Sequence, residues 1–363
     1  ETGMSDVTIG LVEFGFQNAG GQFDETTIQY VLGEGGGVTN DNHGNAVTGL
    51  VCADNDGGGI NGIASSFLWD KLVVAFARPR GLDIFSYAVA MAAVSASADI
   101  VLNAHFAMLG PTRERFSPIF VRARNLMTDA IANSPGVLFI NAAPNVNTRL
   151  TEENAFPAGI RRDNTVTVGA TSSESASRAS SAYGALVDIS APGEGIFVLE
   201  GDGTLRLVGP SENATSIAAP QVASAAALLK SVDRNLSNRE VKSYLLEYVG
   251  GEGFSGPVAV SGEGGVLLNY ARSLMDLLWD RYQDREWAFI MDNDENGVAD
   301  GPSLLAQNLC GDFNLKVEGV GEFDVVPTAD CFGQEQVFFL YANGSSMAVT
   351  LGGYDEDNYR WGM

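Results

Sequence analysis

The chain has 363 residues, 45% of them apolar and 18% charged, which is the composition of a folded globular protein rather than a disordered one. It carries 21 basic and 45 acidic residues, a formal charge of −24, and this argues against nucleic acid as a partner because phosphate binding needs clustered Lys and Arg. No run of about 18 apolar residues occurs, so we expect no membrane span. The length suits one large domain or two smaller ones.

Short apolar runs alternate with Ala-rich segments of helical spacing along most of the chain. The predicted strands cover residues 7–12, 72–76, 100–102, 137–140 and 166–168, and predicted helices cover 86–97 and 122–132. Strands separated by helices predict βαβ units and therefore an α/β fold with a mostly parallel central sheet, covered by helices on both faces. Functional residues of such folds gather at the carboxyl ends of the strands.

The pattern changes after about residue 284. Two segments there, 314–326 and 336–349, favour short β-strands, so we expect a main domain over residues 1–284 and a small β-rich region over 285–363. A hydrophilic segment at the start of this region has the oxygen spacing of a Ca²⁺ loop, with Asp292, Asp294, Asn296 and Asp300 as candidate ligands. Ser303 stands where a bidentate Glu would close such a loop, so a plain acidic turn remains the alternative.

One segment suggests a nucleophile. Ser216 precedes an Ala- and Leu-rich helical stretch, and Pro220 is tolerated best near the start of a helix, where backbone N–H groups lack intrahelical partners. We therefore place Ser216 at a helix N-terminus, where the dipole favours an anion forming beside it. A plain N-cap serine is the alternative for this segment alone.

Three further residues complete a candidate active site. His43, one of two histidines, opens an apolar helix after a polar loop, and could take the Ser216 proton as a base. Glu13 ends the first strand, and a buried carboxylate there needs a partner such as an imidazole N–H. Asn145 follows the strand at 137–140 and could donate a hydrogen bond to an oxyanion.

Together these segments resemble the subtilisin-like serine proteases (subtilases), over roughly residues 5–283. The family order Asp, His, Asn, Ser is similar to Glu13, His43, Asn145, Ser216 at matching separations. The family's Gly-Thr-Ser-Met-Ala-Ser-Pro is similar to the segment 214–220, and its His-Gly-Thr-His-Val-Ala-Gly to the segment 43–49. The resemblance implies a three-layer subtilisin-like fold and a serine endopeptidase.

The resemblance also implies a role for each site residue. Ser216 would be the nucleophile, His43 the general base and then acid, Glu13 its orienting carboxylate, and Asn145 with the Ser216 backbone N–H the oxyanion hole. Residues 100–108 would align an extended peptide or protein substrate as a β-strand. The specificity pocket would have two walls, formed by His105, Phe106 and Ala107 on one side and by Ala142, Ala143 and Pro144 on the other. A pro-segment or inhibitor is a possible further partner, and structural Ca²⁺ a possible cofactor.

Departures from the family pattern leave a second hypothesis open. Glu13 replaces the family's Asp, Pro144 stands where the family has Gly and restricts the backbone of Ala143, and His105 with Phe106 replaces a smaller pair. Ser-His-Glu triads do operate on another scaffold, so the longer carboxylate is chemically acceptable. The alternative to an active protease is a catalytically inactive subtilase-fold pseudoprotease that acts as a binding or scaffold module.

The cysteines bear on the compartment. Cys310 and Cys331 lie close in sequence and could pair, whereas Cys52 sits in an apolar stretch and is expected to be a buried thiol. A disulfide, the acidic surface and the resemblance together favour a secreted or extracellular protein.

Overall fold

The computed structural model describes most of the main domain and several strands of the C-terminal region. The described residues are 6–15, 22–23, 27–33, 42–54, 60–68, 72–80, 83–108, 118–172, 179–210, 212, 214–247, 258–270, 273–274, 277 and five strands between 289 and 351. By contacts the chain divides into two compact units, one of Met4–Glu247 with Pro257–Tyr270, the other of Glu1–Gly3, Tyr248–Gly256 and Ala271–Met363. The division by contacts falls at residue 271, whereas the predicted boundary lies at residue 284, which remains a prediction.

The larger unit is built on an eight-stranded sheet with the order β12-β9-β8-β6-β4-β1-β3-β2, and every neighbouring pair in it is parallel. The strands are β1 (Val7–Val12), β2 (Ile28–Leu32), β3 (Leu72–Ala77), β4 (Ile100–Asn103), β6 (Leu138–Ala142), β8 (Thr165–Thr171), β9 (Ile189–Pro192) and β12 (Val266–Leu267). The predicted parallel sheet is confirmed. The first strand of the chain, β1, lies between β3 and β4, so residues distant in sequence meet at its end.

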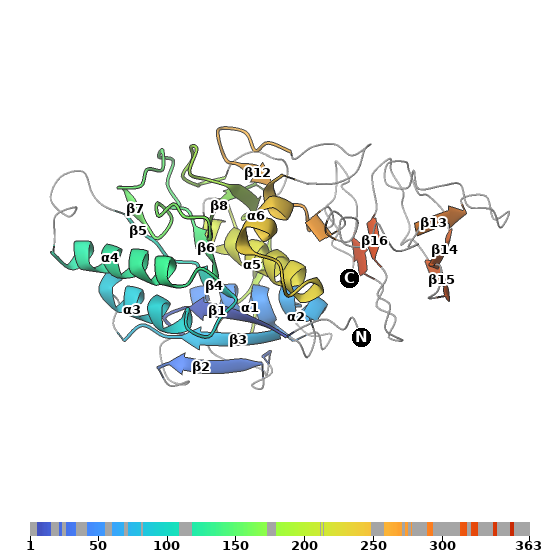
Figure 1. Cartoon of the computed structure of the whole chain (residues 1–363), viewed down its shortest axis with the longest axis horizontal. Coiled ribbons are helices and arrows are strands. Elements are labelled where there is room, and N and C mark those ends of the chain that lie inside the picture. Colours follow the sequence, from blue (N-terminus) through green and yellow to red (C-terminus); the bar gives the residue numbers. More distant parts are fainter. Residues whose placement is uncertain are drawn as a thin grey trace. The chain divides into compact units, whose positions relative to one another are not determined.

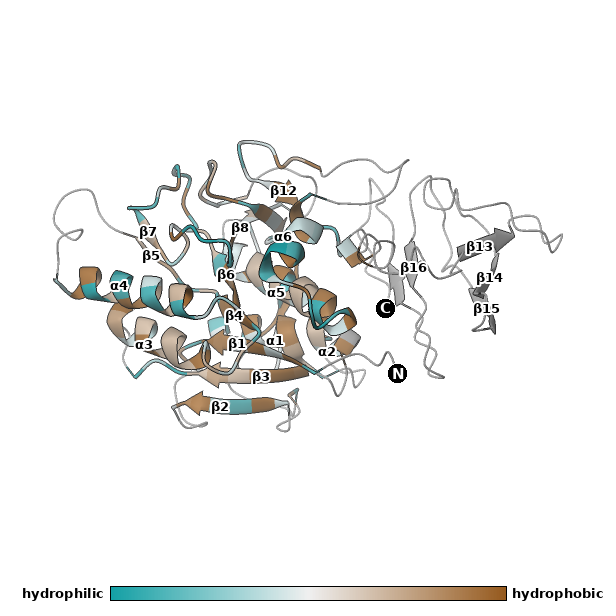
Figure 2. Ribbon diagram, viewed as in Figure 1, coloured by the Kyte–Doolittle hydropathy of each residue, from teal (hydrophilic) through white to brown (hydrophobic). Residues whose placement is uncertain are grey.

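Two helices pack together over one face of this sheet (Figure 1). They are α3 (Ile84–Val94) and α4 (Pro118–Asn133). The buried core on this face includes Met91 and Val94 of α3, Met127 and Ile131 of α4, and Phe139 of β6. Figure 2 shows apolar residues along α3 and alternating polar and apolar residues along α4. Buried Ala123, Met127, Ala130 and Ile131 recur at helical spacing, so α4 covers α3 with one stripe only.

The other face carries α1 (Asn42–Cys52), α2 (Ile63–Leu68) and α5 (Ala214–Val232), with α6 (Asn238–Leu246) packed against α5. Helix α5 contacts β1, β4, β6, β8 and β9, and it is buried from Ala214 to Ser231. Most of its residues are small or apolar, as a helix buried on all sides requires, and its many alanines let it approach the sheet closely. Pro220 lies inside α5, as its seventh residue rather than in its first turn.

Smaller β elements complete the larger unit. A hairpin of β10 (Phe197–Leu199) and β11 (Leu205–Leu207) contacts α1, and β5 (Ala107–Met108) pairs antiparallel with β7 (Ala155–Phe156). In the C-terminal unit, β13 (Phe289–Asp292), β14 (Phe313–Val317) and β15 (Gly321–Val325) form an antiparallel sheet, and β16 (Val337–Phe339) pairs with β17 (Val349–Leu351). The described residues between 285 and 363 all lie in β-strands, as predicted. In the described part of the chain, no helix is both long and apolar enough to cross a membrane.

Candidate active site

Three neighbouring strands each end next to a residue of the predicted site. Glu13 follows β1 directly, His105 comes two residues after β4, and Asn145 comes three residues after β6. The order β6-β4-β1 makes these strands adjacent, and the carboxyl ends of parallel strands share one edge of the sheet. The sheet therefore gathers a carboxylate, an imidazole and an amide, although they are far apart in the sequence.

Glu13 lies at the centre of this cluster and is fully buried. His43, the second residue of α1, places Nδ1 3.2 Å from Glu13 Oε2, and His105 places Nε2 2.8 Å from the same oxygen. An ionised carboxylate only accepts hydrogen bonds, so both ring nitrogens carry the hydrogens they point at it. A neutral His43 then has its lone pair on Nε2, the state that a general base requires.

The charge state of Glu13 follows from these contacts. Burial on its own raises the pKa of this carboxyl group, but the charges of His105 and His43 and their hydrogen bonds outweigh it and lower the pKa from 4.5 to about 2. Glu13 is therefore ionised at every pH at which the protein would work. The expected partnership between Glu13 and an imidazole is present, and it involves two imidazoles rather than one.

Aromatic rings hold His105 in place. Its ring lies 4.8 Å from Phe14 and 5.8 Å from Tyr87, both edge-to-face, and 4.3 Å from the His43 ring at 32°. Buried Tyr87 donates from its hydroxyl to Asn103 Oδ1 (3.2 Å). Burial and the nearby Glu13 charge raise the Tyr87 pKa well above its ordinary value, so the phenol stays protonated as a donor.

Ser216 is the third residue of α5 and is 2% exposed, in the first turn as predicted. Its hydroxyl donates to the carbonyl oxygen of Ala104 at 2.8 Å. A serine hydroxyl has a single proton, so in this arrangement the proton is not shared with His43. Gly193, after β9, lets this helix start approach closely, because a Cβ there would lie 2.3 Å from the Ala214 carbonyl oxygen.

Asn145 is fixed through its side-chain oxygen. Asn145 Oδ1 accepts a hydrogen bond from the backbone N–H of Thr215 (2.9 Å), the residue before Ser216, and lies 2.7 Å from the Thr215 hydroxyl. The hydroxyl also lies 2.6 Å from the Ala143 carbonyl oxygen. The backbone N–H can only donate, so it assigns Oδ1 as the atom facing Thr215 and leaves Nδ2 as the donor side of the amide, the side that an oxyanion would need.

The residues proposed for substrate binding fall into two groups. His105, Phe106 and Ala107 are partly exposed, whereas Ala142, Ala143 and Pro144 are buried. Ala143 donates its N–H to Val168, so that donor is used inside the sheet. The expectation that residues 100–108 align a peptide needs correction for its first half: 100–103 form β4, whose two edges already pair with β1 and β6.

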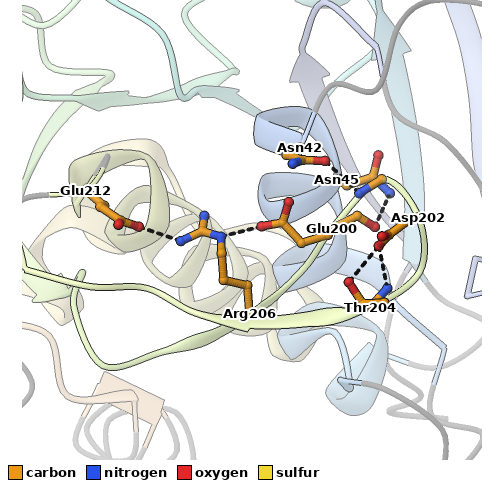
Figure 3. A network of polar contacts seen from close by, with 8 residues as sticks. Asn42, Asn45, Glu200, Asp202, Thr204, Arg206 and Glu212 are labelled. Carbon is orange, nitrogen blue, oxygen red and sulfur yellow. Dashed lines mark hydrogen bonds and ion pairs between the residues drawn. The ribbon is translucent and has the colours of Figure 1, made fainter.

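A second polar network connects the segments that carry His43 and Ser216 (Figure 3). Arg206 on β11 contacts Glu200, and its Nη1 lies 2.5 Å from Glu212 Oε2, just before α5. At the start of α1, Asn42 Oδ1 accepts from Gly201 N (3.0 Å) and Asn45 donates to the Glu200 carbonyl oxygen (3.4 Å). The hairpin β10–β11 thus bridges the two helix starts. None of the strands predicted from the sequence covers this hairpin.

Other predicted sites are only partly covered by the structure. Asp292 ends β13, whereas Asp294, Asn296 and Asp300 lie outside the described residues, as do Cys310 and Cys331. The Ca²⁺ loop and the disulfide therefore stay predictions. Cys52 is buried, as expected. The cluster of Glu13, His43 and His105 is not a Ca²⁺ site by its chemistry, because Ca²⁺ takes six to eight oxygen ligands.

Comparison with known proteins decides the family. The subtilase family model matches residues 12–265, about 70% of the chain. The chain belongs to the subtilase family. Subtilisin BL of Lederbergia lenta is 31% identical to this subtilase over 216 residues, covering 60% of the chain and 73% of that enzyme. Alkaline elastase YaB of Bacillus sp. (strain YaB) is 27% identical over 241 residues, which cover 66% of the chain and 58% of that protein.

Solved structures agree on the fold. A cold adapted subtilisin-like serine proteinase superposes with a TM-score of 0.55 at 21% identity, covering 73% of the chain and 89% of that protein. The prenylagaramide maturation protease PagA superposes with a TM-score of 0.56 at 18% identity, covering 76% of the chain and 95% of that protein. The predicted family and its subtilisin-like α/β fold are confirmed, and the family is one of serine proteases.

Proposed function

We propose that this subtilase is an active serine endopeptidase in which Ser216, His43 and Glu13 form the catalytic triad. The observation that carries the proposal is the 3.2 Å contact between His43 Nδ1 and the buried, ionised Glu13. It supports the His43 tautomer with a free Nε2 lone pair, and it stabilises the imidazolium that forms when Ser216 is deprotonated. The extra methylene of Glu13 is accommodated without loss of this contact.

The reaction follows from these positions. The Ser216 hydroxyl turns from the Ala104 carbonyl toward His43 Nε2, gives up its proton there, and attacks the substrate carbonyl carbon. His43 then passes the proton to the leaving amine as the peptide bond breaks, and an acyl-enzyme on Ser216 remains. A water activated by His43 hydrolyses this ester and regenerates the hydroxyl.

Asn145 and the start of α5 supply the oxyanion hole in this proposal. The Ser216 N–H belongs to the first turn of the helix, where N–H groups lack i−4 partners and the dipole favours negative charge. Asn145 Nδ2 is the second donor, held by the two Thr215 contacts to Oδ1. Removing one such donor costs about 10²–10³ in kcat in proteases of this kind.

The substrate is proposed to be an extended peptide or protein segment. Partly exposed His105, Phe106 and Ala107 would form one wall of its pocket, and the segment from Ala142 to Pro144 the other. A pro-segment or inhibitor would occupy the same place. Secretion and structural Ca²⁺ stay predictions from the sequence.

Fluorophosphonate labelling tests the proposal without a choice of substrate. The purified protein should gain one probe mass per chain, and the Ser216→Ala variant should gain none. Ser224, also buried on α5, gives a matched control: Ser224→Ala should label like the parent. A folded parent protein that takes up no probe would refute the proposal and favour the inactive pseudoprotease. Labelling that persists in Ser216→Ala would refute the assignment of the nucleophile.

A further inference from the structure

Three potential metal ligands converge where the triad carboxylate lies. Glu13 Oε2, His43 Nδ1 and His105 Nε2 all lie within 4.8 Å of one another. The two contacts to Glu13 measure 3.2 and 2.8 Å. Ligands of a tetrahedral Zn²⁺ with bonds of about 2.0–2.1 Å are separated by about 3.3 Å, so the two contacts to Glu13 are already near that spacing, and the two imidazole nitrogens lie within 4.8 Å of each other.

The donor set fits a divalent transition metal. Two imidazoles and one carboxylate form the protein ligands of several zinc sites, with a fourth position left for water. Glu13 Oε1 is buried and makes no hydrogen bond, so a carboxylate oxygen lacks a partner beside the candidate site. The His43 and His105 side chains are 20% and 26% exposed, which gives an ion access from the imidazole side.

We propose that Glu13, His43 and His105 form a binding site for a divalent transition-metal ion such as Zn²⁺, and that this ion reversibly inhibits the enzyme. The inhibitory part rests on the proposed function, whereas the binding part does not. The ion would replace the two N–H···O contacts to Glu13 by metal–nitrogen and metal–oxygen bonds.

Inhibition follows from the position of one proton. Neutral His43 carries its hydrogen on Nδ1, where it is donated to Glu13. A metal ion can bind Nδ1 only when that nitrogen has a free lone pair. The ring hydrogen therefore moves from Nδ1 to Nε2, and the ring loses no proton overall. Neutral His105 changes in the same way, from Nε2–H to Nδ1–H. With Nε2 of His43 protonated, Ser216 has no base to accept its proton, and attack on a substrate stops.

Binding is tested on the Ser216→Ala variant, with Ca²⁺ in excess to occupy calcium sites. Titration calorimetry with ZnCl₂ should show one tight site per chain, and Co²⁺ should give the absorption of a tetrahedral complex. A second substitution, His105→Phe, keeps an aromatic ring between Phe14 and His43 but removes the nitrogen ligand. It should weaken Zn²⁺ binding by about 10–100-fold or more. Asp202→Asn, at an exposed acid outside the cluster, should bind like the parent.

Equal Zn²⁺ affinity in a folded His105→Phe variant, or the absence of a one-equivalent site, would overturn the proposal whether or not the enzyme is active.

Inhibition is tested on the parent by the rate of fluorophosphonate labelling. Zn²⁺ should slow labelling, and calcium-saturated EDTA, which exchanges Ca²⁺ for Zn²⁺, should restore it. Binding with an unchanged labelling rate would overturn the inhibitory role. A parent that never labels would refute the proposed function, and calorimetry would still decide the metal site.

Discussion

Acid should destabilise this subtilase specifically through Glu13. The native pKa of about 2 lies below the ordinary value of 4.5, so the contribution to stability is complete above about pH 4.5 and is lost as the pH falls toward 2. The whole difference corresponds to about 3 kcal/mol, and about 2 kcal/mol of it should disappear between about pH 5.5 and pH 3. Glu13 is fully buried, so solvent screens its interactions with the histidines only weakly.

The assay compares two variants by urea unfolding at these two pH values. Both carry Ser216→Ala to prevent self-digestion, and one also carries Glu13→Gln, which keeps the size of the side chain but does not titrate. Every other acidic group is common to the two proteins, so their difference reports on Glu13 together with its contacts to His43 and His105. The Ser216→Ala protein should lose about 2 kcal/mol more unfolding free energy on acidification than the double variant. Equal losses would show that the two histidines do not hold Glu13 ionised, and the reasoning would fail.

Three further predictions concern the oxyanion donor, the helix start and the buried thiol. Asn145→Ala should lower kcat on a peptide substrate by about 10²–10³ with a small change in KM, and a loss below about tenfold would contradict the assigned donor. Gly193→Ala places a Cβ 2.3 Å from a backbone oxygen and should cost about 1–3 kcal/mol in thermal or urea unfolding, whereas Gly136→Ala, where a Cβ meets nothing within 4 Å, should be nearly neutral. Burial raises the pKa of the Cys52 thiol, so peptide mapping should find it unmodified by iodoacetamide at pH 8 in the folded protein and modified in urea; rapid reaction in the folded state would contradict its burial.

The sequence predicted the elements of the sheet well because buried parallel strands are short apolar runs. The strand predicted at 7–12 is the observed β1, and that at 100–102 lies within β4. Boundaries were less accurate where a side chain sets them. The helix predicted from residue 86 begins at Ile84, because the Asp83 carboxylate accepts hydrogen bonds from the N–H groups of Phe85 and Ser86.

The second partner of Glu13 could not be predicted from local patterns. His105 is 92 residues away, and the contact exists only because β1 pairs with β4, with Leu11 opposite Leu102. Strand order depends on the whole topology and not on the periodicity of any one segment. A usable signal was present: a histidine two residues after a buried strand, in a chain with only two histidines. The resemblance implies for this histidine only a place in a pocket wall.

Helix α5 lies late in the sequence of the larger unit, and this determines the order in which the site residues emerge during synthesis. Synthesis proceeds from the N-terminus at about 5–20 residues per second, so Glu13, His43 and His105 emerge well before Ser216. The proposed acid and base and most of the central sheet are present in a nascent chain that still lacks the proposed nucleophile. Helix α5 also packs along one face of that sheet and carries Ser216, so this part of the core and Ser216 are completed together. Under the proposed function, a partly synthesised chain would therefore be unable to cut itself or its neighbours.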